Sequence, residues 1–354
     1  MINIANPMLG EEEKKAVMDV LNSGMLVQGA KVEEFEKKFA EYIGTKYAVA
    51  TSSGTTALHL ALLAMGVGPG DEVITTSFSF IATANSILYC GAKPVFADID
   101  SKTFNIDPEK ISEKITAKTK AIIPVHLYGQ PAEMDSIIKI AKEHQIKILE
   151  DAAQAHGSEY KGKKSGSLGD CAAFSFYATK NMITGEGGMV TTNSEEIAEK
   201  IRKLRSHGQT KTYEHEILGF NLRMMNLTAA IGLEQLKKLE NFNKKRAENA
   251  DFLTKNLKDI VETPFVSKNV KHAFHQYTIK TENRDSLLKK LNENGIGARV
   301  YYPKPIHKQP FYQKLGYKDS LPVSEEMAKK VISLPVHPNL KKEDLEHIVK
   351  TIRR

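Results

Sequence analysis

Short apolar runs that alternate with helical patterns constrain the fold of this chain more than any other feature. Most of these runs are rich in Val, Ile, Ala and Phe and show no alternation between apolar and polar residues. Such strands are typical of a sheet covered by helices on both faces. The expected strands are Tyr47–Thr51, Glu72–Thr76, Pro94–Ala97, Ala121–His126, Lys147–Glu150, Ala172–Phe176 and Gly188–Thr192. Helical stretches lie between them, such as Thr56–Met65, Ala82–Leu88 and Met134–His144. The alternation predicts an α/β domain with a mainly parallel central sheet.

The rest of the chain predicts a second, smaller α+β domain. Asn226 to about Leu257 has the pattern of one long helix, or two in tandem, that could bridge two domains. An amphipathic helix is expected at Glu11–Asn22. Beyond the bridge, we expect strands at His275–Thr281 and Ala298–Tyr302, and helices at Arg284–Asn294, Ser324–Ser333 and Lys342–Arg353. A length of 354 residues agrees with two domains. We place the large domain at residues 1–245 and the small C-terminal domain at residues 246–354.

The composition argues against several other classes of protein. Hydrophobic residues make up 41% and charged residues 26%, which is ordinary for a globular protein. No apolar run approaches the roughly 20 residues that span a bilayer, and the first residues do not form a secretory signal. We therefore expect a cytoplasmic protein with no membrane partner, in which Cys90 and Cys171 are free thiols. The net charge of +7 suits an anionic metabolite or a nucleic acid, but no basic run or motif supports nucleic-acid binding.

The segment Ser52–Leu58 follows an expected strand and opens an expected helix. Its small residues would let the backbone approach an anion closely, and a helix N-terminus offers unpaired N–H groups and the positive end of a dipole. A phosphate therefore fits here. Ser, Gly and Thr are also the usual residues of an ordinary N-cap turn, so both interpretations stay open.

A second candidate site residue is an acid at the end of a strand. The strand beginning at Lys147 ends in Glu150 and Asp151. Ligands of open α/β sheets bind at the carboxyl ends of the strands, where an acid can hold a proton on a basic ring nitrogen. Asp151 is equally suited to be a helix N-cap, and the sequence alone does not decide between the two roles.

A third candidate is Lys180, which follows the strand at Ala172–Phe176 and precedes the glycine-rich stretch Gly185–Gly188. Most lysines are solvated surface charges. A lysine approached by small and apolar residues and packed closely by glycine-rich chain would have a depressed pKa and act as an amine nucleophile.

Other motifs are missing or incomplete. No G-x-G-x-x-G follows an expected strand, which disfavours a nicotinamide or flavin site. The stretch from Gly157 to Lys164 nearly spells a phosphate-binding P-loop, but Lys164 stands where Ser or Thr must hold magnesium. His272 and His275 have no cysteine or acid at ligand spacing, so we expect no metal site.

Taken together, the motifs resemble the DegT/DnrJ/EryC1/StrS family of sugar aminotransferases, which are pyridoxal-phosphate enzymes of the aspartate aminotransferase fold (fold type I). The resemblance runs from Asn22–Gly24 to His337-Pro338 and is specific in the combination and order of its motifs. These are Ser53-Gly54-Thr55-x-Ala57-Leu58, Gly68-x-Gly70-Asp71-Glu72-Val73-Ile74, Phe80-x-Ala82-Thr83-Ala84-Asn85, Glu150-Asp151-Ala152-Ala153-Gln154, Gly185-Glu186-Gly187-Gly188, Gly219-Phe220-Asn221-Leu222-Arg223-Met224 and Tyr301-Tyr302-Pro303.

The resemblance implies a role for each matching residue. Lys180 stands at the lysine that binds the cofactor covalently, and Asp151 at the acid that pairs with the pyridine nitrogen. The other implied cofactor contacts are Phe80 stacked on the ring, Gly54, Thr55 and Ser175 around the phosphate, Gln154 near the phenolic oxygen, and Asn221 reaching the phosphate from a partner subunit. The implied substrate contacts are Arg223 across the subunit interface, and Tyr302 and His307 at the nucleotide-sugar.

The implied reaction moves an amino group from an amino acid, expected to be L-glutamate, to C3 or C4 of a keto-sugar linked to a nucleoside diphosphate. Its expected setting is the synthesis of amino sugars for surface polysaccharides, by a homodimer with shared active sites. Some relatives with histidine at the lysine position are dehydratases, so Lys180 favours transamination. Two alternatives stay open: another enzyme of fold type I, such as a lyase or an amino acid aminotransferase, and a non-enzymatic regulatory protein that keeps the fold.

Overall fold

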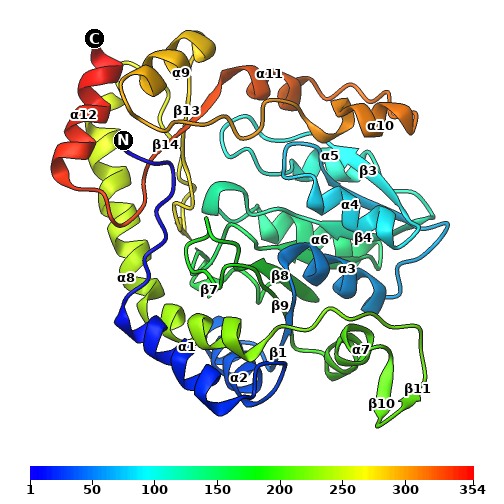
Figure 1. Cartoon of the computed structure of the whole chain (residues 1–354). Helices are drawn as coiled ribbons and strands as arrows, with labels where there is room; N and C mark the ends of the chain where they lie inside the picture. Colours follow the sequence, from blue (N-terminus) through cyan, green and yellow to red (C-terminus); the bar gives the residue numbers. More distant parts are fainter.

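The computed structural model describes all residues from 1 to 354 and contains a central seven-stranded sheet (Figure 1). The strand order is β1-β9-β8-β5-β4-β2-β3. Only β9 runs antiparallel to its neighbours, because it pairs antiparallel with both β1 and β8 while the other pairs are parallel. The strands are β1 (Tyr47–Thr51), β2 (Glu72–Thr76), β3 (Lys93–Ala97), β4 (Thr119–Ile123), β5 (Lys147–Asp151), β8 (Cys171–Ser175) and β9 (Gly188–Thr192). The expected α/β class with a mainly parallel sheet is confirmed.

Both faces of the sheet are buried under helices, which explains why the strands lack polar alternation. Within β1, Val49 belongs to one buried cluster while Ala48 and Ala50 belong to another. The first face is covered by α3 (Gly54–Ala64), α4 (Ala82–Tyr89) and α7 (Glu195–Arg205). The second is covered by α2 (Ala30–Ile43), α5 (Pro108–Ser112), α6 (Met134–Glu143) and the first half of α8 (Asn226–Leu257).

The far half of α8, which lies beside α12 in Figure 1, is surrounded by a separate hydrophobic core. It begins at Ala250 and includes β13 (Tyr277–Lys280), β14 (Val331–Leu334), α9 (Arg284–Glu293) and α12 (Lys342–Arg353). The division at residue 245 remains our proposal. Ile2 joins this second core, because its backbone pairs with Gly295 and Gly297 at 2.8 and 2.7 Å. The first residues therefore pack with the small unit, although we assigned them to the large domain.

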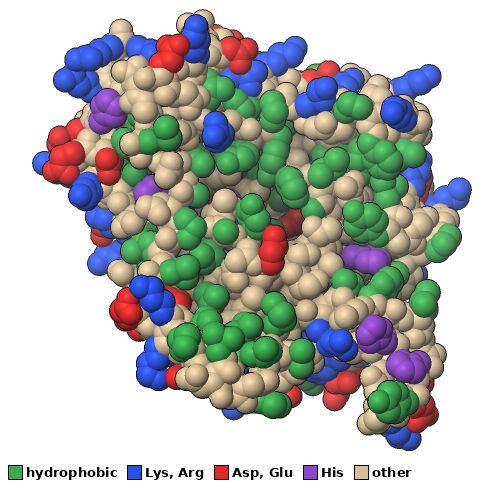
Figure 2. All heavy atoms as spheres, in the orientation of Figure 1, with side chains coloured by type: hydrophobic (Ala, Val, Ile, Leu, Met, Phe, Trp, Pro, Cys, Tyr) green, Lys and Arg blue, Asp and Glu red, His purple; other side chains and the backbone are tan.

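The remaining elements are short or peripheral. They are α1 (Glu11–Ser23), β6 (Glu159–Tyr160), β7 (Lys163–Lys164), β10 (Gln209–Lys211), β11 (Glu214–His215), β12 (Val270–Lys271), α10 (Pro310–Lys314), α11 (Pro322–Lys330) and the 3₁₀ turns η1 (Leu127–Gly129) and η2 (Ile306–Lys308). None of the helices is both long enough and apolar enough to cross a membrane. On the face shown in Figure 2, Lys and Arg side chains lie mainly around the periphery, while the centre carries mostly hydrophobic and uncharged side chains.

Two expectations for the C-terminal region were wrong. The helix expected at Ser324–Ser333 begins at Pro322 and ends at Lys330, and the apolar residues after it form β14 against β13. Ser324 does not cap this helix, since its hydroxyl donates to Asp98 Oδ1 at 2.6 Å. The strand expected at Ala298–Tyr302 is reduced to one bridge between Arg299 and Ser333. Beyond that bridge the chain leaves the small unit, because Tyr302 reaches Gln154 of the large one.

Candidate active site

The turn between β1 and α3 has the features of an anion cradle. The Ser53 hydroxyl caps the helix by accepting from the Thr56 N–H at 3.2 Å. The N–H groups of Gly54 and Thr55 donate to no atom of the chain. A Cβ atom on Gly54 would lie 2.6 Å from the Ser175 Cβ, so the absence of a side chain lets the two segments touch. The turn is therefore both a capped helix start and a place where free N–H groups can bind a phosphate.

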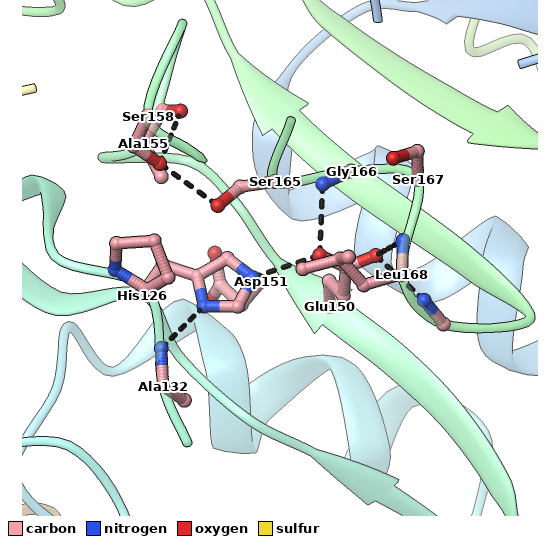
Figure 3. A network of polar contacts seen from close by, with 12 residues as sticks. His126, Ala132, Glu150, Asp151, Ala155, Ser158, Ser165, Gly166, Ser167 and Leu168 are labelled. Carbon is pink, nitrogen blue, oxygen red and sulfur yellow. Dashed lines mark hydrogen bonds and ion pairs between the residues drawn. The ribbon is translucent and has the colours of Figure 1, made fainter. Parts of the chain in front are cut away.

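Glu150 and Asp151 point to opposite sides of β5, as consecutive strand residues do, and they have different surroundings (Figure 3). No helix follows Asp151, so the N-cap interpretation was wrong. Its Oδ2 atom accepts from the Thr83 hydroxyl at 2.8 Å and its Oδ1 atom from the Ala153 N–H at 3.2 Å. Burial raises the pKa of Asp151. The two hydrogen bonds and the charge of Lys180 favour the carboxylate and act in the opposite direction, but burial is the larger effect. A protonated ring nitrogen beside it would stabilise the ionised form.

Glu150 is fully buried and anchors a loop (Figure 3). Its carboxylate accepts from the N–H groups of Gly166, Leu168 and Gly169 at 2.7 to 2.8 Å, and it pairs with His126 Nε2 at 2.9 Å. The Nδ1 atom of His126 accepts from the Ala132 N–H at 3.0 Å, so Nε2 carries the proton that is donated to Glu150. Of the two acids, only Asp151 is available to a ligand.

Lys180 lies in the loop after β8, and this loop is held by the glycine-rich stretch. The N–H of Phe176 donates to Gly187 O at 2.9 Å, and a Cβ atom on Gly187 would lie 2.5 Å from Thr184 Oγ1. Removal from water lowers the pKa of Lys180 to about 8, although the nearby Asp151 carboxylate acts in the opposite direction. The amine is therefore available in its neutral form near physiological pH, as a nucleophile requires.

Gln154 and two aromatic residues form another wall of the site. The Gln154 Oε1 atom accepts from the Tyr128 N–H at 2.8 Å, which orients its Nε2 donor toward Tyr302 Oη at 3.1 Å. The rings of Tyr302 and Phe80 lie 6.3 Å apart between centroids. Phe80 is 57% exposed, which is unusual for a large aromatic side chain and leaves a ring face free for stacking.

The other predicted residues are placed differently. Asn221 is exposed and Arg223 partly exposed, and no side-chain hydrogen bond within the chain holds either one. They flank Leu222, whose carbonyl accepts from the Ser52 N–H at 2.9 Å, so this segment borders the anion cradle. His307 is fully buried, with Nδ1 2.6 Å from Ser77 Oγ and Nε2 3.1 Å from Glu325 Oε1. Its ring atoms are occupied by these contacts, so we leave His307 out of the proposed substrate contacts.

Sequence reasoning missed the residues that position the site from behind. Thr83 holds Asp151, Tyr128 orients Gln154, and the His126–Glu150 pair fixes the loop next to β5. Thr83 lies inside one of the motifs, three residues after Phe80, which is the only local signal for it. The others depend on contacts between distant segments.

The residues present fit pyridoxal phosphate. The free N–H groups beside Ser175 suit its phosphate, the carboxylate of Asp151 suits its ring nitrogen, and the amine of Lys180 suits its aldehyde. The three groups lie at the carboxyl ends of β1, β5 and β8, where ligands of such sheets bind.

Comparison with known proteins identifies the family of the chain. The family model of the DegT/DnrJ/EryC1/StrS aminotransferase family matches residues 7–353. A pleiotropic regulatory protein of Geobacillus stearothermophilus is 46% identical over 97% of this chain and 94% of its own. The GDP-perosamine synthase of Caulobacter vibrioides is 43% identical over 98% of this chain and 96% of its own. The structure of the PLP form of Spr1654 from Streptococcus pneumoniae, described as a sugar aminotransferase, superposes with a TM-score of 0.95 at 31% identity, over 99% of this chain and 97% of its own. The chain belongs to the DegT/DnrJ/EryC1/StrS aminotransferase family.

Proposed function

We propose that the protein is a pyridoxal-phosphate-dependent aminotransferase that moves an amino group from L-glutamate to a keto-sugar linked to a nucleoside diphosphate. One observation carries the proposal: a lysine whose pKa is lowered to about 8 lies near a buried aspartate, at the same edge of the sheet as a helix start with free N–H groups. The family and the related PLP-form structure support the cofactor. The relative that makes GDP-perosamine supports a nucleotide-linked sugar.

The proposed division of labour follows from the positions of the side chains. Bound pyridoxal phosphate supplies an electron sink for the electrons released when the donor loses its Cα proton. Lys180 would hold the cofactor through its aldehyde and, once free, would carry the donor's Cα proton to the former aldehyde carbon. Asp151 keeps a proton on the ring nitrogen. Gly54, Thr55 and Ser175 bind the phosphate, Phe80 covers the ring, and Gln154 offers a donor to the phenolic oxygen.

We propose a homodimer in which Asn221 of one subunit reaches the phosphate of the other, and Arg223 the donor or the sugar. Both side chains are without hydrogen bonds in the single chain, which leaves them free to reach a ligand of the partner subunit. Large apolar side chains are exposed nearby in sequence: Leu218 is 87% and Met225 48% exposed. Exposed apolar surface of this kind is typical of a protein interface. Tyr302 remains the proposed sugar contact, through its place beside Phe80.

The regulatory alternative deserves a test, because one relative carries the name of a regulatory protein. A protein that had lost catalysis would be expected to have lost part of the cofactor site, and here Lys180, Asp151 and the cradle are all intact. Binding to nucleic acid is disfavoured because the sequence has no basic run and no nucleic-acid-binding motif.

The decisive experiment is a visible absorption spectrum of the protein with pyridoxal phosphate, recorded before and after addition of L-glutamate. We expect a yellow band that gives way to the pyridoxamine form, followed by turnover with keto-sugar nucleotides. A band that ignores glutamate would favour a lyase or another donor, and no band at all would favour the regulatory alternative. Lys180→Ala should bind the cofactor without that band and show no steady-state transamination, and appreciable turnover would refute the assignment.

A further inference from the structure

The residue after Lys180 is held by a buried network that reaches two other parts of the fold. Asn181 is only 3% exposed. Its Nδ2 group donates to Asn243 Oδ1 and to Ala273 O, both at 2.8 Å, and its Oδ1 atom lies 3.1 Å from His275 Nδ1. Both donors and the acceptor of this amide are thus in use, which is typical of a side chain that fixes a local geometry.

The partners of Asn181 come from different elements. Asn243 lies on α8 and donates from its own Nδ2 to His156 O at 2.7 Å, in the chain that follows Asp151. Ala273 and His275 lie in the segment that leads into β13 of the small unit. The buried Arg246, one turn along α8, donates to Phe274 O and His275 O at 3.2 and 3.3 Å and holds that segment in place.

Lys180 has no such restraint of its own. Its Nζ atom makes no hydrogen bond or ion pair within the chain, and only its backbone N–H is bonded, to Tyr177 O at 2.9 Å. A flexible side chain with a free end depends on its backbone for direction. The neighbouring Asn181 is the residue that attaches this backbone to the buried network.

We propose that Asn181 is a positioning residue for Lys180, through which α8 and the small unit fix the orientation of the amine and its shielding from water. The proposal uses the proposed function only in taking Lys180 as the nucleophile. It predicts that loosening the network lets water reach the lysine, even when no cofactor or substrate is bound.

The groups that face Lys180 make its titration a usable readout. They are the Asp151 carboxylate, the rings of His156 and His275, and the guanidinium of Arg246, which lines the same small cavity as Lys180. Burial lowers the pKa of His156 to about 3 and that of His275 well below its usual value, so both rings stay neutral while the lysine titrates. In the alanine variants, a change in the titration of Lys180 would then reflect its hydration and its distance from Asp151.

The test compares Asn181→Ala and Asn243→Ala with the matched control Asn249→Ala. Asn249 is also a buried asparagine on α8 and also bonds the small unit, at Val336 O and His337 O, but it does not touch the lysine loop. A fourth variant, Asn181→Asp, keeps the shape and removes both donors. All are studied as apoprotein by thermal unfolding, by hydrogen exchange of residues 176–184, and by the pH dependence of acetylation of Lys180, read by mass spectrometry.

We expect both alanine variants in the network and Asn181→Asp to lower amide protection in this loop by roughly tenfold or more, since each leaves buried groups unpaired. We also expect the midpoint of Lys180 acetylation to move to higher pH. Asn249→Ala should lose thermal stability without either change. In the double variant Asn181→Ala/Asn243→Ala, the loss of protection should be less than additive, because the two residues share one hydrogen bond that either single variant already removes.

Unchanged acetylation and loop protection in Asn181→Ala would overturn the proposal, and so would equal changes in Asn249→Ala, which would indicate general destabilisation. Failure of the proposed function would be seen separately. In that case the wild-type protein would give no spectral change with glutamate, while the network variants would still shift the acetylation of Lys180.

Discussion

Replacing Glu150 by glutamine should destabilise the protein by about 2–6 kcal/mol, at almost no change in volume. The carboxylate accepts four hydrogen bonds in a fully buried position, two at each oxygen. Glutamine keeps one oxygen and replaces the other with an NH₂ group. If the oxygen stays with Leu168 and Gly169, the NH₂ group faces the Gly166 N–H and the proton on His126 Nε2, and two buried donors lose their acceptor.

The histidine cannot repair this mismatch by changing its tautomer. Moving its proton to Nδ1 would let Nε2 accept from the new amide, but Nδ1–H would then face the Ala132 N–H. At least two donors therefore remain unpaired in either state. At about 1–3 kcal/mol for each buried unpaired group, the sum is about 2–6 kcal/mol.

Urea unfolding at fixed protein concentration, followed by far-UV circular dichroism, measures the effect, since the chain has no tryptophan to report by fluorescence. The control is Glu143→Gln on α6, an exposed side chain whose only ion pair is with Lys139 at 3.9 Å, for which we expect a much smaller loss. A loss below about 1 kcal/mol for Glu150→Gln would refute the reasoning, because it would mean that the buried donors find other acceptors.

Three further predictions concern the cofactor site. Thr83→Val removes the hydroxyl that donates to Asp151 at 2.8 Å, so the pKa of this buried acid should rise further and the glutamate half-reaction should slow by about tenfold, measured by stopped-flow absorption. Because Thr83 acts through Asp151, the double variant Thr83→Val/Asp151→Asn should be as slow as Asp151→Asn alone. Additive slowing in the double variant would contradict this connection. Gly54→Ala puts a methyl group 2.6 Å from the Ser175 Cβ, so the affinity for pyridoxal phosphate should fall. Fluorescence titration measures this affinity, and an unchanged value would mean that the turn at Gly54 does not bind the phosphate. The pKa of Lys180 is lowered to about 8, so its acetylation in the apoprotein should rise with pH to a midpoint near 8, whereas a midpoint at the usual value for lysine would show that the amine is solvated.

The large sheet could be predicted because its strands are buried on both faces, and the apolar runs such as Tyr47–Thr51 and Gly188–Thr192 therefore stand out from their flanks. The helices Ala30–Ile43 and Glu195–Arg205 were not predicted, although their buried residues recur at helical spacing. The strand Val331–Leu334 was assigned to the preceding helix. A short apolar run after a helix fits either state, and only its pairing with Tyr277–Lys280 decides the outcome.

The residues of the candidate site also fall into those that a local sequence pattern predicts and those that depend on contacts between distant segments. Asp151 and Lys180 could be found because each follows a strand end, which is a local pattern with a known consequence. The side chains that support them could not, because Thr83 lies 68 residues from Asp151 and Asn243 lies 62 from Asn181. His307 shows the opposite case. Its position in the sequence matched a substrate contact of the family, but its ring is enclosed between Ser77 and Glu325.

The pairing of Ile2 with Gly295 and Gly297 has a consequence for synthesis of the chain. Ile2 leaves the ribosome long before its partners do, so this stretch must remain unpaired until the chain has been made as far as Gly297. The sheet of the large unit, whose last strand ends at Thr192, can assemble in the meantime. Folding is then expected to finish with the chain's beginning docking onto its final third, which would make closure of the small unit a late, non-local event.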